Sequence, residues 1–127
     1  MAEYGLKKAE KLCSKMHVDA LFSKGKSIVA YPVRCVYKTS ARTDGAPVQF
    51  MITVPKKHIR HAVDRVLLRR RIRESYRLNK EIIVEAAKEN DKRIDLAFIY
   101  ITDSIKDYAY IERKMQKLLN TIVERQK

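Results

Sequence analysis

The sequence predicts a single α/β domain, a two-layer sandwich with the element order α-β-β-α-β-α. Three segments, 15–24, 61–80 and 107–123, carry apolar residues at helical spacing. Three others, around 27–37, 48–54 and 94–101, are rich in Val, Ile, Tyr or Phe, as strands are. No linker rich in Gly, Ser or Pro divides the 127 residues. We therefore expect one domain spanning 1–127, with residues 1–12 flexible at its amino end.

The amino-terminal half is predicted to contain one helix and two strands. Ser14 can cap a helix over 15–24. The segment 27–37 is rich in Val, Ile and Tyr, with Val33, Cys35 and Tyr37 on one face, which predicts one strand. The apolar run 48–54 predicts a second. The segment 39–47 between them gathers Ser, Thr, Asp-Gly and Pro, which are turn residues. A hairpin of these two strands is the simplest arrangement.

The carboxy-terminal half is predicted to contain a basic helix, a strand and a final helix. No glycine or proline interrupts 61–80, and Asn79 offers a soft stop or kink before more helical sequence at 81–89. The run 94–101, which is apolar apart from Asp95, suits a strand covered on both faces. Asp107 can cap a last helix with an apolar stripe, which we expect to cover the sheet.

The charge of the chain is concentrated in one segment. Lys and Arg number 28 against 15 Asp and Glu, giving a net charge of +13. Residues 56–80 contain 10 basic and 2 acidic groups, a net charge of +8, whereas residues 81–127 contain 9 of each sign and balance. A localised excess of this size indicates a docking surface for a polyanion.

Most of this charge falls on one face of the predicted basic helix. At 100° per residue, six cations share an arc of about 140°: Arg65, Arg69, Arg70, Arg73, Arg77 and Lys80. Arginine binds phosphate oxygens bidentately and stacks on bases, which suits structured RNA. The pattern alone would also fit a DNA major groove or an anionic membrane surface. Val66 lies in the middle of this arc, where it has no predicted core to join.

The remaining composition gives no sign of a secreted, membrane or metal-binding protein. The chain begins without an apolar signal region, its longest purely apolar stretch is only Leu96 to Ile101, and its two cysteines, Cys13 and Cys35, have no C-x-x-C spacing. We therefore expect a reduced, cytoplasmic protein with no membrane partner. His58 and His61 are close in sequence but lack further ligands for zinc.

Several motifs together resemble the protein component of bacterial ribonuclease P over nearly the whole chain. The matching segments are Leu21–Ser27, Val54–Lys57, Ala62–Arg65 and Arg69–Arg77, with weaker agreement at Asp95-Leu96 and at Tyr108 with Ile111-Glu112. The sequence departs from the family at two places. The family's arginine-asparagine-arginine core is here Arg65-Val66-Leu67, and one of two phenylalanines in the first helix is here Val18.

The resemblance implies a protein subunit of an endoribonuclease that removes the 5′ leader of precursor tRNA, in which a catalytic RNA with bound Mg²⁺ carries the chemistry. It implies no catalytic residue and no metal ligand in the protein, and no DNA partner. The RNA-binding residues that it implies are Lys56, Lys57, Arg60, Arg65, Arg69, Arg70, Arg73, Arg77 and Lys80. A leader-binding cleft would contain Val18, Phe22 and Tyr37. The implied fold is a small mixed sheet with an unusual left-handed β-α-β crossover.

Three alternatives remain at this stage. A structural, ribosomal-type RNA-binding protein would have the same basic helix without a processing role. A self-sufficient nuclease would need clustered carboxylates or paired histidines, which are not evident. A DNA-binding regulator would be a dimer, and no dimer interface is evident in the pattern.

Overall fold

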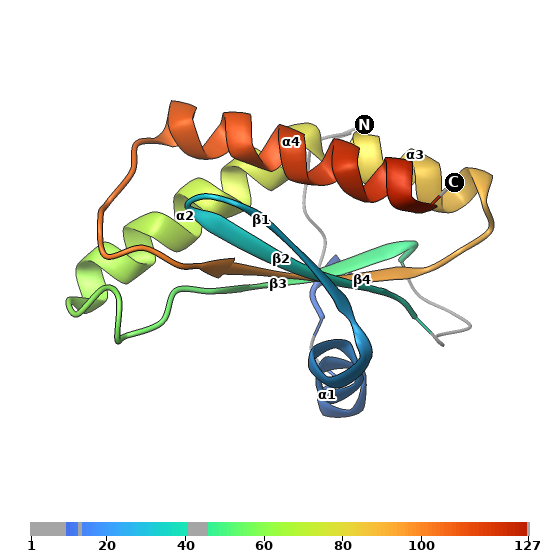
Figure 1. Ribbon diagram of the computed structural model, residues 1–127, viewed down its shortest axis with the longest axis horizontal. Helices are drawn as coiled ribbons and strands as arrows, with labels where there is room; N and C mark the ends of the chain where they lie inside the picture. Colours follow the sequence, from blue (N-terminus) through green and yellow to red (C-terminus); the bar gives the residue numbers. More distant parts are fainter. Residues whose placement is uncertain (1–9, 13, 41–45, 127) are drawn as a thin grey trace.

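A four-stranded mixed sheet is the centre of the fold (Figure 1). The computed structural model describes residues 10–12, 14–40 and 46–126. Its strands are β1 (Lys26–Ala30), β2 (Val33–Thr39), β3 (Val48–Thr53) and β4 (Ile94–Tyr100), in the order β1-β2-β4-β3. β4 pairs antiparallel with β2 and parallel with β3, which confirms the predicted mixed sheet.

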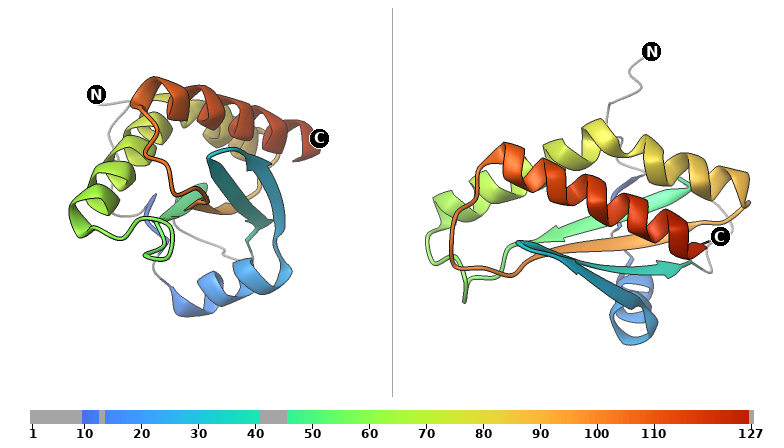
Figure 2. Two further views of the ribbon diagram at one scale, coloured as in Figure 1. Left: turned by 60° about the vertical axis from the view of Figure 1, so that its left-hand side comes forward. Right: turned by 45° about the horizontal axis from the view of Figure 1, so that its top comes forward.

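Helices cover both faces of this sheet to different extents. α2 (Ala62–Asn79), α3 (Glu81–Glu89) and α4 (Tyr108–Gln126) lie on one face, and α1 (Lys15–Lys24) lies alone on the other (Figures 1 and 2). The large core lies between the sheet and α2–α4, and the small core lies under α1. The predicted α/β sandwich is therefore confirmed, with α1 as an addition on the second face.

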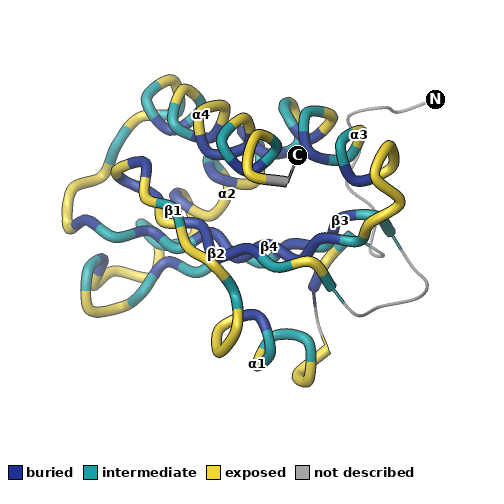
Figure 3. Tube along the Cα trace, turned by 45° about the vertical axis from the view of Figure 1, so that its right-hand side comes forward, coloured by how far each residue is buried: buried dark blue, intermediate teal, exposed yellow. Residues whose placement is uncertain are grey.

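The central strand β4 joins the two cores because its successive side chains point to opposite faces. Leu96 and Phe98 are fully buried in the large core, while Ala97 is fully buried in the small core beside Leu21 and Val36. Figure 3 shows β2 and β4 as largely buried, whereas β1 and α1 are largely exposed. Burial on both faces explains why 96–100 is a continuous apolar run.

The basic helix α2 is held to the sheet by an aromatic cluster. The ring of Tyr76 lies 4.5 Å from that of Phe50 on β3 and 5.5 Å from that of Phe98 on β4, measured between centroids. Tilted contacts at these distances add to the free energy gained by burying the rings. Ile72 and Leu68, one and two turns earlier, are also fully buried.

The prediction of one strand over 27–37 was wrong. A two-residue turn at Tyr31-Pro32, whose peptide bond is cis, divides it into β1 and β2, which pair antiparallel. Pro32 was the available signal, since proline is excluded from the interior of a central strand. The predicted hairpin with 48–54 was also wrong, because β4 lies between β2 and β3. Part of the turn predicted over 39–47, residues 41–45, lies outside the described residues.

The predicted helix limits agree closely with the structure. α1 spans the predicted residues, although Ser14 forms no side-chain cap. Gly25 follows it, and a Cβ there would come within 2.3 Å of the Leu21 carbonyl oxygen, so the close approach requires glycine. The predicted break at Asn79 separates α2 from α3. Asp107 caps α4, since its Oδ1 accepts a hydrogen bond from the Tyr110 N–H at 2.9 Å.

Residues 10–12 pack against the sheet and α2, although we expected flexibility up to residue 12. Lys11 forms a parallel bridge with Phe50, and the Leu12 N–H donates to the Phe50 carbonyl at 2.9 Å. Lys80 Nζ lies 2.8 Å from Glu10 Oε1, and both side chains are nearly buried. This ion pair joins the segment to the α2–α3 junction. Residues 1–9 lie outside the described part of the chain.

The chain crosses from β3 to the parallel strand β4 through α2 and α3. This confirms a β-α-β unit around the basic helix. The strand order does not fix the hand of the crossover, so the left-handed sense stays a prediction.

Loss of the hydroxyl group should change the free energy of unfolding differently at two buried tyrosines. The Tyr100 hydroxyl donates to the Ser104 carbonyl and accepts the Lys106 N–H at 3.0 Å, whereas the Tyr76 hydroxyl has no hydrogen-bond partner among the described residues. We expect Tyr100→Phe to lower the free energy of unfolding by about 1–2 kcal/mol and Tyr76→Phe to leave it unchanged or raise it. Urea denaturation of both variants measures this, and equal losses would contradict the assignment.

The Lys80–Glu10 pair should contribute measurably to stability. Lys80→Ala leaves the Glu10 carboxylate nearly buried without its ammonium partner, so we expect the free energy of unfolding to fall by about 1–3 kcal/mol. Lys88→Ala is the matched control, because Lys88 is an exposed lysine on α3. A loss no larger than that of the control, in urea denaturation of both variants, would rule out a stabilising pair.

Candidate nucleic-acid interface

The arginines of α2 divide into groups with different surroundings. The core side of the helix is Leu68, Ile72, Ser75 and Tyr76, all fully buried. Arg69, Arg70 and Arg73 are exposed, and within the described chain none of the three guanidinium groups has a hydrogen bond or ion pair. Unpaired like charges on one surface repel each other, and a polyanion would relieve this repulsion. We call these three residues the arginine triad.

Two predicted RNA-binding arginines at the ends of this surface already have partners. Arg65 Nη1 donates to the carbonyl oxygens of Ile59 at 3.0 Å and Arg60 at 2.8 Å, so it fastens the loop before α2. Arg77 forms a bidentate pair with Glu74, with Nη2 3.0 Å from Oε2. The hydrogen bond from Arg77 lowers the pKa of Glu74. Both arginines lie at the border of the surface, and some of their N–H donors are already used in these hydrogen bonds.

The structure does not place Lys80 on the exposed surface. The predicted helical arc included it, but the helix breaks at this residue, and its ammonium group is buried against Glu10. Lys56, Lys57 and Arg60, in contrast, are exposed in the loop between β3 and α2. They extend the basic surface beyond the amino end of α2.

Arg71 lies between the two sides of the helix. It is half-buried, and its Nη1 donates to the Lys106 carbonyl at 2.5 Å. Its charge therefore helps to attach the loop before α4 to α2 and does not belong to the triad.

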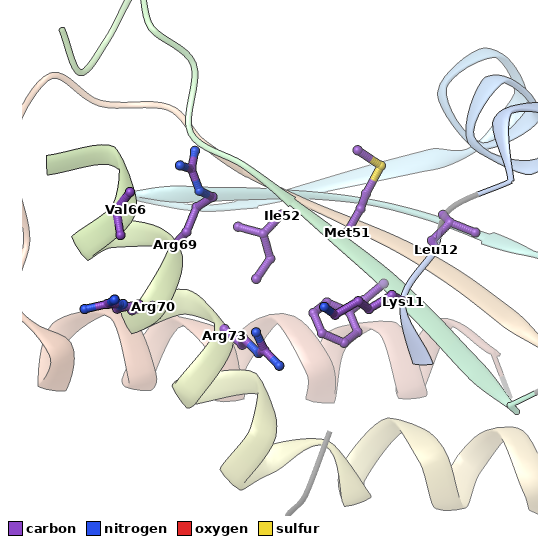
Figure 4. A pocket seen from close by; sticks show the side chains of 9 residues that line it. Lys11, Leu12, Met51, Ile52, Val66, Arg69, Arg70 and Arg73 are labelled. Carbon is purple, nitrogen blue, oxygen red and sulfur yellow. The ribbon is translucent and has the colours of Figure 1, made fainter. Parts of the chain in front are cut away.

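A cavity of about 410 Å³ lies beside the arginine triad, between α2 and the edge of β3 (Figure 4). Its apolar lining comes from Leu12, Phe50, Met51, Ile52 and Val66, and its cationic lining from Lys11, Arg69, Arg70 and Arg73. Val66, which had no expected neighbour in the sequence, thus belongs to the wall of this cavity. The arrangement combines an apolar hollow with cations at its border.

The predicted leader cleft is only partly supported by the positions of its three residues. Val18 packs on the small core and Phe22 is 46% exposed, so both lie on the α1 side. Tyr37 is buried in the large core, on the opposite face of the sheet, and its hydroxyl accepts from Arg125 Nη1 at 3.3 Å. Tyr37 therefore cannot line a cleft with Val18 and Phe22. Side-chain alternation along β2 places Val36 on the α1 face instead.

A cluster of cations and tyrosines lies at the start of α4. The sequence did not predict it, because the charges of residues 81–127 balance. Lys106, Arg113 and Lys114 each lie 5.3–5.4 Å from the centre of the Tyr110 ring, and Lys106 is also 5.5 Å from the Tyr31 ring. Cations at such distances are attracted to the ring faces. A count of charges along the chain averages these residues with the acidic residues of the same segment.

The two histidines of the β3–α2 loop have different surroundings. His58 Nδ1 lies 2.8 Å from Asp103 Oδ1, which joins this loop to the one after β4, and His61 is exposed. Cys35 is fully buried, and its burial raises the pKa of the thiol. No group of three or more His, Cys, Asp or Glu that could hold a metal ion occurs among the described residues. None of the described helices could span a membrane.

Comparisons with known proteins agree with the resemblance seen in the motifs. The family model Ribonuclease P matches residues 6–123. The chain is 36% identical to the ribonuclease P protein component of Porphyromonas gingivalis over 118 residues, covering 93% of this chain and 86% of that protein. It is 37% identical to the ribonuclease P protein component of Chlorobaculum tepidum over 93 residues, covering 68% and 60%.

Solved structures show the same fold at lower sequence identity. The ribonuclease P protein of Staphylococcus aureus has a TM-score of 0.71 at 20% identity, covering 91% of this chain and 96% of that one. The ribonuclease P protein of Thermotoga maritima has a TM-score of 0.70 at 22% identity, covering 88% and 96%. With its motifs, its fold and a family match over nearly its whole length, the chain belongs to the family of bacterial ribonuclease P protein components.

Proposed function

We propose that this chain binds the catalytic RNA of ribonuclease P and the 5′ leader of precursor tRNA, and so assists the Mg²⁺-dependent endonucleolytic removal of that leader. Family membership supports a role in the ribonuclease P holoenzyme. The observation that carries the RNA-binding part is the unpaired arginine triad beside the loop cations. The catalytic chemistry belongs to the RNA in this proposal, and the protein positions its partners.

The catalytic RNA would lie along α2 and the loop before it. Exposed cations would bind its phosphates: Lys56, Lys57, Arg60, Arg69, Arg70 and Arg73. Arg65 and Arg77 would bind at the border with their remaining donors, while they keep the loop and the helix surface in place. Because guanidinium groups bind phosphate in a fork, arginines fixed on a helix can set the orientation of a folded RNA as well as its affinity.

The single-stranded leader would lie on the face of the sheet that α1 leaves partly open. Phe22 offers an exposed ring on which an unpaired base can stack, and Val18 lies on the same helix. The exposed guanidinium of Arg34 points to this face from β2, because Arg34 alternates with the inward-facing Val33 and Cys35. Stacking tolerates any base, which suits a set of leaders with different sequences.

Magnesium ions would be bound mainly by the RNA. Bound Mg²⁺ would supply activation of the attacking water and stabilisation of the leaving oxygen. The contribution of this chain in the proposal is to bring the two RNAs together. Neutralising their phosphates reduces the repulsion that Mg²⁺ would otherwise have to screen. We place this holoenzyme in the cytoplasm, where tRNA matures.

The alternative is a structural RNA-binding protein with no role in processing. The arginine triad would serve such a protein equally well, because phosphate contacts position RNA of many kinds. Cleavage, and not affinity, distinguishes the two functions.

The arginine triad should determine the salt dependence of RNA binding. Replacing Arg69, Arg70 and Arg73 together by glutamine removes three phosphate contacts, and each contact contributes roughly 0.7 to 0.9 to the slope of log affinity against log salt. We expect the slope to become shallower by about 2. The measurement is filter binding of bacterial ribonuclease P RNA between low and moderate salt.

The control for this experiment removes the same charge elsewhere. Lys88, Lys92 and Lys117 are exposed and lie outside α2, so their joint replacement by glutamine should change the slope by less than the triad variant does. An unchanged slope in the triad variant would rule out α2 as the RNA-binding surface.

Processing should require both the protein and the RNA. We expect a precursor tRNA to be cleaved at low Mg²⁺ by ribonuclease P RNA with this protein, and only weakly by either one alone. Activity of the protein alone would indicate a nuclease. Tight RNA binding without faster cleavage would instead support the structural alternative.

A further inference from the structure

An apolar side chain in the middle of a cationic surface needs an explanation. Val66 is 40% exposed and lies one turn before Arg69 and Arg70 on α2. It lines the cavity of about 410 Å³ together with Ile52 and Met51 of β3 and with Leu12. Figure 4 shows Ile52 in the space between β3 and α2, with Val66 across from it on the helix. The volume lies within the range of roughly 300–1,000 Å³ that small-molecule sites occupy.

The cavity also lies at the backbone edge of β3, which no described residue covers at Ile52. β3 is the outermost strand of the sheet, and the segment 10–12 covers only the part of its edge at Phe50. The Phe50 carbonyl points outward, since it accepts from the Leu12 N–H. Backbone groups two residues apart on a strand point the same way, so the N–H and C=O of Ile52 also face this edge. No described strand or segment pairs with the edge at Ile52.

The border of the cavity is cationic. Lys11, Arg69 and Arg73 are exposed and line it, from the amino-terminal segment on one side and from α2 on the other. An apolar hollow, a backbone donor and acceptor side by side, and surrounding cations match the three parts of a nucleotide. These are the faces of the base, the hydrogen-bonding edge of the base and the phosphates.

We propose that this cavity binds the base of an unpaired nucleotide that is turned out of the RNA held by the arginine triad. The base lies between Val66 and Ile52, the backbone of Ile52 hydrogen-bonds to its edge, and Lys11, Arg69 and Arg73 bind the flanking phosphates. This inference rests on the proposed RNA-binding function and adds a subsite to it. An extended peptide could also pair with an open strand edge, but the cationic border favours a polyanion.

The first test separates apolar contact from charge. Val66→Gln removes an apolar wall of the cavity and keeps every charge. Val63→Gln is the matched control, because Val63 is a valine one turn earlier on the same helix, is 79% exposed and does not line the cavity. We expect Val66→Gln to weaken binding of ribonuclease P RNA by about 5- to 20-fold, with an unchanged salt slope, and Val63→Gln to have little effect.

The outcomes of this test are distinct from those for the proposed function. Equal affinities for the two valine variants, while the triad variant shows a shallower slope, would overturn the subsite and leave the RNA-binding surface in place. An unchanged slope in the triad variant would overturn the surface itself. A thermal melt of each variant confirms that both proteins are folded.

The second test observes the cavity directly by methyl NMR of the intact chain. Adenosine and uridine 5′-monophosphates should shift the methyl signals of Val66 and Ile52, and ribose 5-phosphate should not, because it lacks the base. Equal shifts with ribose 5-phosphate would show phosphate binding alone and overturn the proposal. Shifts caused by an extended valine-threonine peptide, and by neither nucleotide, would assign the edge to a peptide and also overturn it.

Discussion

The packing of α2 on the sheet is the contact on which the functional surface depends. Tyr76 lies against Phe50 and Phe98, and Leu68 and Ile72 continue the same buried stripe along the helix. This stripe fixes how the helix is rotated about its own axis. Because a helix turns 100° per residue, fixing the buried stripe also fixes the direction in which the arginine triad points. In the proposed function, the aromatic cluster would thus act on RNA binding without contacting RNA.

The same packing brings three separate parts of the chain to one border of the sheet. α2 lies beside the outer strand β3, and residues 10–12 complete the border, held by the Lys80–Glu10 pair at the end of α2. The resulting surface combines arginines that have no partner among the described residues with an apolar cavity at the edge strand β3. Lys80 is not part of this surface, because it is paired with Glu10. Arg65 and Arg77 already use some of their N–H donors in hydrogen bonds within the protein. The exposed charge is consequently more concentrated around the triad than the sequence suggested.

Sequence prediction succeeded where a local signal was strong and failed where pairing was decided at a distance. Helices α1 and α4, the break at Asn79 and the buried strand β4 follow from caps, glycine and apolar runs near them in the chain. The hairpin was wrong because β4, more than forty residues away, pairs with both β2 and β3. Tyr37 was assigned to the wrong face, since alternation shows which residues share a face and leaves open which helix covers it.

The sequence by itself determined the α/β class, the position of the basic helix, the arginine-rich surface and, through its motifs, the family. These depend on composition, periodicity and short-range order, which can be read from residues close together in the sequence. Only the tertiary structure decided which cations are free, that Tyr37 is buried away from α1, and that Val66 lines a cavity with Ile52 and Leu12. Each of these depends on contacts between residues far apart in the chain, and such contacts form only when the sheet and its helices pack together.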